Sequence, residues 1–136
     1  MTTQPAKAPD LDSINLDTPI FDPKAFRLDD AQAAIMTTAR RLGQTVFAQR
    51  AATYDREAKF PSENYRDLHA SGLLGIAIPK KHGGLGANYQ TYAITAAEIG
   101  RYCGATGLTW NMHVCSTLGS GPLADDLEMD DATRAE

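Results

Sequence analysis

Three histidines and two cysteines are the side chains of this chain best suited to hold a metal or act as a nucleophile or base. No two of them have the close spacing that puts metal ligands on one helical face or in one knuckle, and the cysteines form no Cys-x-x-Cys pair. The spacing therefore predicts no metal site. Structural or surface roles are expected for all five residues, which are His69, His82, His113, Cys103 and Cys115.

A glycine-rich stretch follows His82, and glycine amides can stabilise an oxyanion or cradle a phosphate. The chain has no Gly-x-Ser-x-Gly turn of the esterase type, no Gly-x-Gly-x-x-Gly pattern and no Gly-Lys-Ser/Thr ending. Residues 83–86 are therefore expected to form a plain turn with left-handed positions.

Glu98 is the one acid within an apolar stretch that we expect to be helical, and it has no obvious partner in the sequence. A salt bridge at the helix surface is the expected role of such a residue. On residue types and spacing alone, the sequence shows no active site and no catalytic residue.

The composition indicates one globular domain. The chain has 136 residues, 43% of them hydrophobic and 22% charged, which suffices for a single modest core. Its net charge is −4, with most of the acidic excess in residues 123–136 and no basic stripe with interleaved aromatics, so it lacks the footprint of a nucleic-acid binder. It has no signal-peptide pattern and no apolar run of membrane-spanning length, and its cysteines fit a reducing compartment. We expect a cytoplasmic protein without membrane insertion.

Helix signals predict an all-α fold with four main helices. Asp29 and Gln32 form a capping-box pattern, Pro61 suits a first helical turn, Gly72 suits a left-handed helix end, and Asn88 can cap another helix. The four helices are expected at residues 29–53, 61–71, 88–103 and 106–119. The apolar stripe of the first helix consists of Leu28, Ala31, Ile35, Ala39, Leu42 and Val46.

The remaining segments complete the expected organisation. Residues 1–27 are predicted to be an irregular lead-in, and residues 73–78 a buried connection rather than a strand. The helix at residues 106–119 is apolar on most of its circumference, so other protein must cover it. Residues 119–122 are expected to break the chain, and residues 130–136 look like a helix that has only begun. We therefore expect a domain over residues 28–136 that is truncated at its C-terminal end.

Residues 60–86 contain an ordered series of prolines and glycines. It reads Phe-Pro, six residues, Leu68, three residues, Gly-Leu-Leu-Gly, three residues, Pro79, three residues and Gly-Gly-x-Gly. This series resembles the N-terminal domain of the acyl-CoA dehydrogenase family. The resemblance continues through residues 97–100 (Ala-Glu-Ile-Gly) and residues 110–113 (Trp-Asn-Met-His), and covers about two-thirds of the chain.

The resemblance implies a full-length flavoenzyme of which this chain is one part. In the family, a base removes the α-proton of an acyl-CoA thioester, the β-hydride passes to FAD, and electrons leave to a protein acceptor. The N-terminal helices cover the acyl cleft, while later domains, often with a second subunit, hold the flavin and, in most members, the catalytic glutamate. We therefore expect a homo-oligomeric parent that binds FAD and acyl-CoA, and an isolated chain that is inactive and does not hold FAD firmly.

Two alternatives remain open at this point. Flavin-dependent monooxygenases and nitroalkane oxidases share the same N-terminal pattern. The chain could also be a non-catalytic helical interaction module built on the same scaffold.

The resemblance also implies substrate-binding residues. Thr109, His113 and Thr117 recur every four residues along one stripe of the fourth helix, and they resemble the positions that line the far end of the acyl pocket. We expect this stripe to be more exposed than Leu108, Met112 and Cys115. The alternative is that the threonines bond back to helix carbonyls and that His113 is a satisfied core histidine.

Overall fold

The computed structural model describes the backbone of residues 21–126 and the side chains of residues 21–119. Residues 1–20 of the predicted lead-in and the predicted helix start at residues 130–136 lie outside the described residues. The described part is mostly helical and contains no strand, which confirms the all-α prediction. In chain order the elements are α1 (Asp30–Leu42), the π-helical turn η2 (Gly43–Phe47), α2 (Ala48–Arg56), α3 (Ser62–Ala70), the short 3₁₀ turns η3 (Leu73–Gly75) and η4 (Lys80–His82), α4 (Tyr89–Tyr102) and α5 (Gly104–Asp126).

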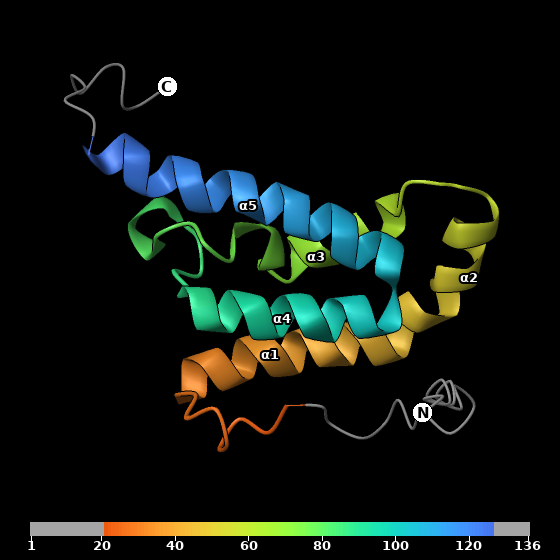
Figure 1. The fold of residues 1–136 in the computed structure, drawn as a ribbon, viewed down its shortest axis with the longest axis horizontal. Helices are drawn as coiled ribbons and strands as arrows, with labels where there is room; N and C mark the ends of the chain where they lie inside the picture. Colours follow the sequence, from red (N-terminus) through yellow and green to blue (C-terminus); the bar gives the residue numbers. More distant parts are fainter. Residues whose placement is uncertain (1–20, 127–136) are drawn as a thin grey trace, which may run out of the picture.

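The four predicted helices correspond to the run α1–η2–α2, to α3, to α4 and to α5. Helix α4 lies between α1 and α5, and α3 lies against α5 (Figure 1). The first run is continuous, because helical geometry passes through η2 without a break. Within the described residues no helix is long and apolar enough to cross a membrane.

The predicted helix ends agree with the observed ones at three places. Gln32 N donates to Asp29 Oδ1 at 2.8 Å, and Asp29 N donates to Gln32 Oε1 at 3.0 Å, which is the expected capping box. Asn88 Oδ1 accepts from Thr91 N at 2.9 Å at the start of α4. Gly72, with φ of 77°, follows α3 in the left-handed region, where a glycine carries no Cβ penalty.

The C-terminal boundary of the fourth helix was predicted wrongly. Instead of breaking at residues 119–122, α5 continues to Asp126. Glycine weakens a helix by conformational entropy but can adopt helical angles, so glycines signal a break without enforcing one.

Most of the predicted apolar stripe of the first helix faces the core. Ala39 is fully buried, and Ile35, Leu42 and Val46 are partly buried against the core. The exception within the stripe is Ala31, which is exposed.

The inward face shifts by one position at η2. There the amide of Ala48 bonds to the carbonyl of Gly43, so this turn holds one more residue than an α-helical turn. Phe47 is fully buried, whereas Val46 before it is only partly buried. A stripe of constant period cannot anticipate this shift.

The connection after α3 is buried, as predicted. Leu73 and Ile76 are fully buried within η3 and the turn that follows it. Gly83 and Gly86 have φ of 83° and 61°, which confirms the expected left-handed positions.

Glu98 is not at the helix surface, and the expectation of a surface salt bridge was wrong. Its side chain is fully buried, and Oε1 accepts from Arg40 Nη2 at 2.6 Å and from Arg40 Nε at 3.1 Å. Arg40 belongs to α1, and an acid on the α1 side of α4 cannot reach solvent because α4 lies between two helices. The result is a buried ion pair between α1 and α4.

Candidate functional site

Helix α5 is fixed to the rest of the domain along one side. Trp110 and Val114 are fully buried, and Trp110 Nε1 donates to the carbonyl of Leu73 at 3.0 Å. Gly107 lies against Gly100, where a Cβ on Gly107 would come within 2.6 Å of the Gly100 Cα. The two helices therefore touch backbone to backbone at this crossing.

The proposed substrate stripe lies beside this buried side. His113 is half-buried, its Nε2 is 3.1 Å from the carbonyl oxygen of Leu74, and its ring meets the Tyr65 ring edge to face. Thr109 Oγ1 donates to a carbonyl one turn back at 2.8 Å, and Thr117 Oγ1 donates to another at 2.9 Å. The polar atoms of this stripe thus find partners inside the domain, as the structural alternative predicted.

The expected order of exposure along α5 was wrong. Thr109, His113 and Thr117 are all half-buried, whereas Leu108 and Met112 are 66% and 64% exposed. The physical reason is that α5 packs on α4 and on η3 together, and His113 reaches a carbonyl of η3 that the short turn leaves without a helical donor. The opposite side of α5 receives no cover from the described residues. We call Leu108, Met112 and Cys115 the outer face of α5.

A polar cluster joins the middle of α5 to the start of α4. The Tyr92 hydroxyl bonds to Asn111 Oδ1 and is 3.4 Å from Cys115 Sγ. Burial first, and the thiol contact second, raise the pKa of Tyr92 to about 12. The phenol therefore stays protonated at neutral pH, and it serves as a hydrogen-bonding contact between the two helices rather than as a base.

A second polar network passes through three helices. Arg50 Nη1 in α2 donates to Asn64 Oδ1 at 2.8 Å and to Asp67 Oδ2 at 2.6 Å in α3. Asn64 is fully buried, and its Nδ2 donates to Thr106 Oγ1 in α5 at 2.8 Å. Thr106 in turn donates to Cys103 Sγ at 3.1 Å. This chain of hydrogen bonds connects α2, α3, α5 and the end of α4.

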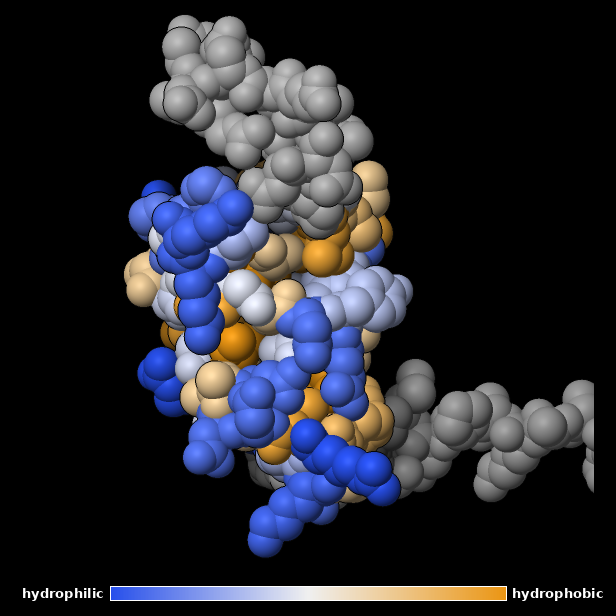
Figure 2. All heavy atoms as spheres, turned by 90° about the vertical axis from the view of Figure 1, so that its left-hand side faces the viewer, coloured by the Kyte–Doolittle hydropathy of each residue, from blue (hydrophilic) through white to orange (hydrophobic). Residues whose placement is uncertain are grey.

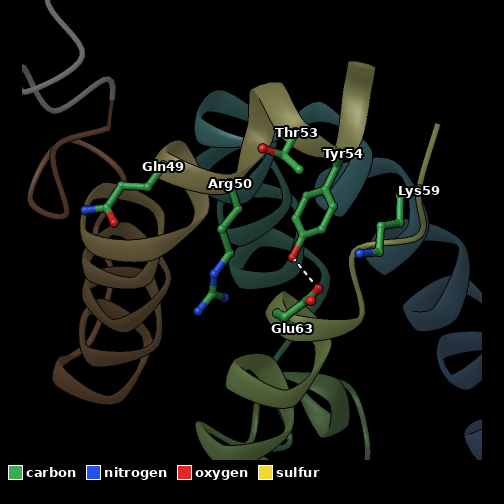
Figure 3. A pocket seen from close by; sticks show the side chains of 6 residues that line it. All are labelled: Gln49, Arg50, Thr53, Tyr54, Lys59 and Glu63. Carbon is green, nitrogen blue, oxygen red and sulfur yellow. Dashed lines mark hydrogen bonds between the residues drawn. The ribbon is translucent and has the colours of Figure 1, made fainter. Parts of the chain in front are cut away.

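A polar recess of about 190 Å³ opens beside this network (Figure 3). Arg50 and Lys59 lie on either side of Tyr54, whose hydroxyl donates to Glu63 Oε2 at 2.8 Å. The hydrogen bond from Tyr54 lowers the pKa of Glu63, and the bond to Asp67 raises the pKa of Arg50. Because acids already face the cations, the recess has no unbalanced charge that would select an ionic ligand.

The glycine loop cannot act as a phosphate cradle in this conformation. The amides of residues 83–87 all donate to backbone carbonyls of residues 75–80, at 2.9–3.3 Å. Gly84 is held so closely that a Cβ would lie 2.1 Å from the carbonyl oxygen of Ile78. These glycines serve the turn itself. They do not fit the diphosphate of a dinucleotide cofactor, which needs amides that are free to donate.

Residues 29–125 match a family described as "Acyl-CoA dehydrogenase, N-terminal domain". The chain belongs to the acyl-CoA dehydrogenase family. The match includes all five α-helices of the structure, α5 to within its last residue, and it confirms the resemblance seen in the proline and glycine series.

The chain is similar to several curated members of this family or its relatives. It is 31% identical to the probable acyl-CoA dehydrogenase YngJ of Bacillus subtilis, over 72% of this chain and 25% of the relative. It is 31% identical to the human mitochondrial short-chain specific acyl-CoA dehydrogenase, over 74% and 24% respectively. A 3-sulfinopropanoyl-CoA desulfinase of Paraburkholderia xenovorans is 34% identical over 60% and 21%. The matched region spans about a quarter of these relatives, and no solved structure matches the chain significantly.

The sequence did not indicate the Arg50 network or the partner of Glu98. The bonds from Arg50 to Asn64, from Asn64 to Thr106 and from Arg40 to Glu98 join residues that are 14 to 58 positions apart, so helical periodicity carries no signal for them. The alternative for His113 is a satisfied core histidine; its ring nitrogen has a partner in the Leu74 carbonyl, but the side chain is only half-buried. Its proposed role at the substrate remains a prediction.

Proposed function

We propose that this chain is the N-terminal helical domain of a flavin-dependent oxidoreductase that acts on an acyl-CoA thioester. The parent reaction in this proposal is α,β-dehydrogenation of the thioester, with the hydride passed to FAD. The observation that carries it is the family match over residues 29–125. Three relatives support the substrate class, because their names specify a dehydrogenase, a desulfinase and a reductase that each act on a CoA thioester.

In this proposal the chain contributes a wall of the parent protein and no reacting group. The glycine loop has no free amides, the polar recess is balanced in charge, and Tyr92 is kept protonated. The FAD and the catalytic base would come from residues outside this domain. The outer face of α5 supports this arrangement, because exposed apolar side chains in a row usually mark an interface.

The role of Thr109, His113 and Thr117 as substrate-lining residues stays part of the proposal. It rests on the resemblance of this helix to the family. In the parent protein His113→Leu should shift the preferred acyl-chain length while leaving FAD bound, because only the shape and polarity of the pocket would change. An unchanged chain-length profile, together with lowered thermal stability, would assign His113 to packing alone.

The experiment that tests the function begins with the DNA beyond the codon for Glu136. The protein of the whole reading frame is purified and titrated anaerobically with a series of acyl-CoA thioesters. The proposal expects a yellow protein whose flavin absorbance bleaches while a trans-2-enoyl-CoA forms. A protein without flavin, or one that no acyl-CoA bleaches, contradicts it.

The same titration separates the two alternatives. A monooxygenase or nitroalkane oxidase of this fold would leave acyl-CoA unchanged and would instead consume oxygen with its own substrate. A non-catalytic interaction module would show neither flavin nor oxygen consumption.

A further inference from the structure

Residues 21–28 precede α1 and form a small unit of their own, which we call the strap. Within it, the amide of Phe26 donates to the carbonyl of Asp22 at 3.3 Å, and that of Leu28 to Pro23 at 3.0 Å. The rings of Phe21 and Phe26 meet edge to face with centroids 5.4 Å apart. The strap therefore has internal contacts that do not depend on the helices.

Few polar contacts tie the strap to the bundle. Among the described residues these are two side-chain hydrogen bonds to its backbone. Arg40 Nη2 donates to the carbonyl of Phe21, and Gln90 Nε2 to that of Phe26, each at 3.0 Å. Arg40 also donates to Glu98, whereas Gln90 is an exposed side chain at the start of α4. Releasing the strap would break no helical hydrogen bond.

The strap does not fill the space against α4. An apolar hollow of about 430 Å³ lies there. On the face of the molecule drawn in Figure 2, hydrophobic side chains remain visible between hydrophilic ones. Such a loose contact gains less dispersion energy than a close-packed core. The residues that line it are Phe21, Phe26, Tyr89, Gln90, Ala93 and Ile94.

The backbone at the end of the strap has the conformation of a hinge. Arg27 has φ of 52°, which is uncommon for a residue with a Cβ and costs free energy. Two residues later the capping box of Asp29 fixes the start of α1. A rotation at Arg27 would therefore move residues 21–26 and break the bond from the Leu28 amide to Pro23, while the helix stays in place.

We propose that the strap is a hinged cover that opens at Arg27 and uncovers the apolar side of α4 at Ile94, which is buried in the closed form, while α1 and α4 stay folded. The four observations agree: internal contacts, two side-chain ties, a hollow beneath and a left-handed residue at the junction. This device is independent of the proposed reaction, because it involves no residue assigned to the substrate.

Native-state hydrogen exchange of the 136-residue chain tests the cover. The amide of Leu28 is the reporter, because its bond to the carbonyl of Pro23 crosses the hinge and must break when the strap opens. In increasing low concentrations of urea, this amide should exchange through an opening that hardly depends on denaturant, while amides of α1 and α4 show the steep dependence of global unfolding. Gln90→Ala removes one tie, so exchange at Leu28 should rise about tenfold, the worth of one hydrogen bond. Gln49→Ala, an exposed glutamine that makes no contact with the strap, is the matched control and should change nothing there.

Two results would overturn the proposal. One is a Leu28 amide that shares the denaturant dependence of α1 and α4 in the unmodified chain, since the strap would then open only with the bundle. The other is Gln90→Ala without effect on exchange at Leu28, or with equal effects on Leu28 and on the amides of α1.

Discussion

Helices α4 and α5 are neighbours of similar apolar character, yet the domain uses them differently. α4 is covered on two sides, by α1 and α5, and it buries even Thr95 and Glu98 completely. α5 carries no Asp, Glu, Lys or Arg from residue 104 to 124, but Leu108 and Met112 are left exposed. The sequence of an apolar helix thus indicates that other protein must cover it. Only the packing shows which of its sides are covered by the same chain.

The polar residues of α4 and α5 also differ in how they are accommodated. In α4 a charge is buried because a partner from α1 neutralises it, at the cost of removing both groups from water. In α5 the half-buried Thr109 and His113 bond to backbone carbonyls, while the apolar Leu108 and Met112 on the opposite side stay exposed. Changes on α4 should therefore affect folding strongly, and changes on the outer face of α5 should affect it little.

The largest effect is expected from the buried ion pair. Glu98→Gln leaves the Arg40 guanidinium without its counter-charge in the core, so it should lower the free energy of unfolding by about 3–5 kcal/mol. Urea denaturation measures this change. Glu57→Gln, at an exposed helix end, is the control and should stay within about 0.5 kcal/mol. Equal losses for both variants would mean that the pair does not stabilise α4 against α1.

The crossing of α4 and α5 should be the next most sensitive point. Gly107→Ala places a Cβ 2.6 Å from the Gly100 Cα, and because both atoms belong to backbones, the helices must separate. We expect a loss of about 3 kcal/mol in thermal or urea unfolding. Gly104→Ala meets nothing within 4 Å and should be neutral or slightly stabilising. A tolerated Gly107→Ala would show that the two helices are not in backbone contact.

Deprotonation of Tyr92 should lower the free energy of unfolding by a smaller amount, and only at alkaline pH. Its pKa is raised from about 10 when unfolded to about 12 when folded, so the protonated phenol stabilises the fold fully below pH 10. That contribution, about 2–3 kcal/mol, is lost as pH rises from 10 to 12. The stability of the unmodified chain relative to Tyr92→Phe should fall over this range. A constant difference would indicate that the hydroxyl is not shielded from water.

The smallest effect is expected at the outer face of α5. Leu108→Ser and Met112→Gln should each change the stability of the chain by about 0.5 kcal/mol or less, because these side chains are already exposed. Val114→Ser, on the buried side of the same helix, is the matched variant and should cost several times more. Large losses at Leu108 or Met112 would contradict the assignment of this face as uncovered.

Local signals in the sequence predicted the fold well. Caps at Asp29 and Asn88 and the left-handed Gly72 act within one helical turn, so residue type alone reveals them. The π-helical turn at η2 escaped prediction because it depends on one inserted residue whose position is set by packing, with Gly43 directly against the Tyr102 ring.

The candidate site was less predictable than the fold. The four-residue spacing shows that Thr109, His113 and Thr117 share one side of α5. It does not show whether that side faces the domain or solvent, since a nearly uniformly apolar helix has no preferred buried side. Partners such as Arg40 and Glu98 meet only after α1 and α4 are packed, and nothing in their local sequence indicates the pairing.

The two cysteines allow the most direct test of the difference between the covered and uncovered sides of α5. Cys115 lies on the outer face and is exposed, while Cys103, between α4 and α5, is buried. In the native 136-residue chain, a thiol reagent followed by peptide mass spectrometry should modify Cys115 at least about a hundredfold faster than Cys103, which reacts only when the domain opens. Equal rates for the two thiols, or a protected Cys115, would contradict the claim that α5 presents a bare face.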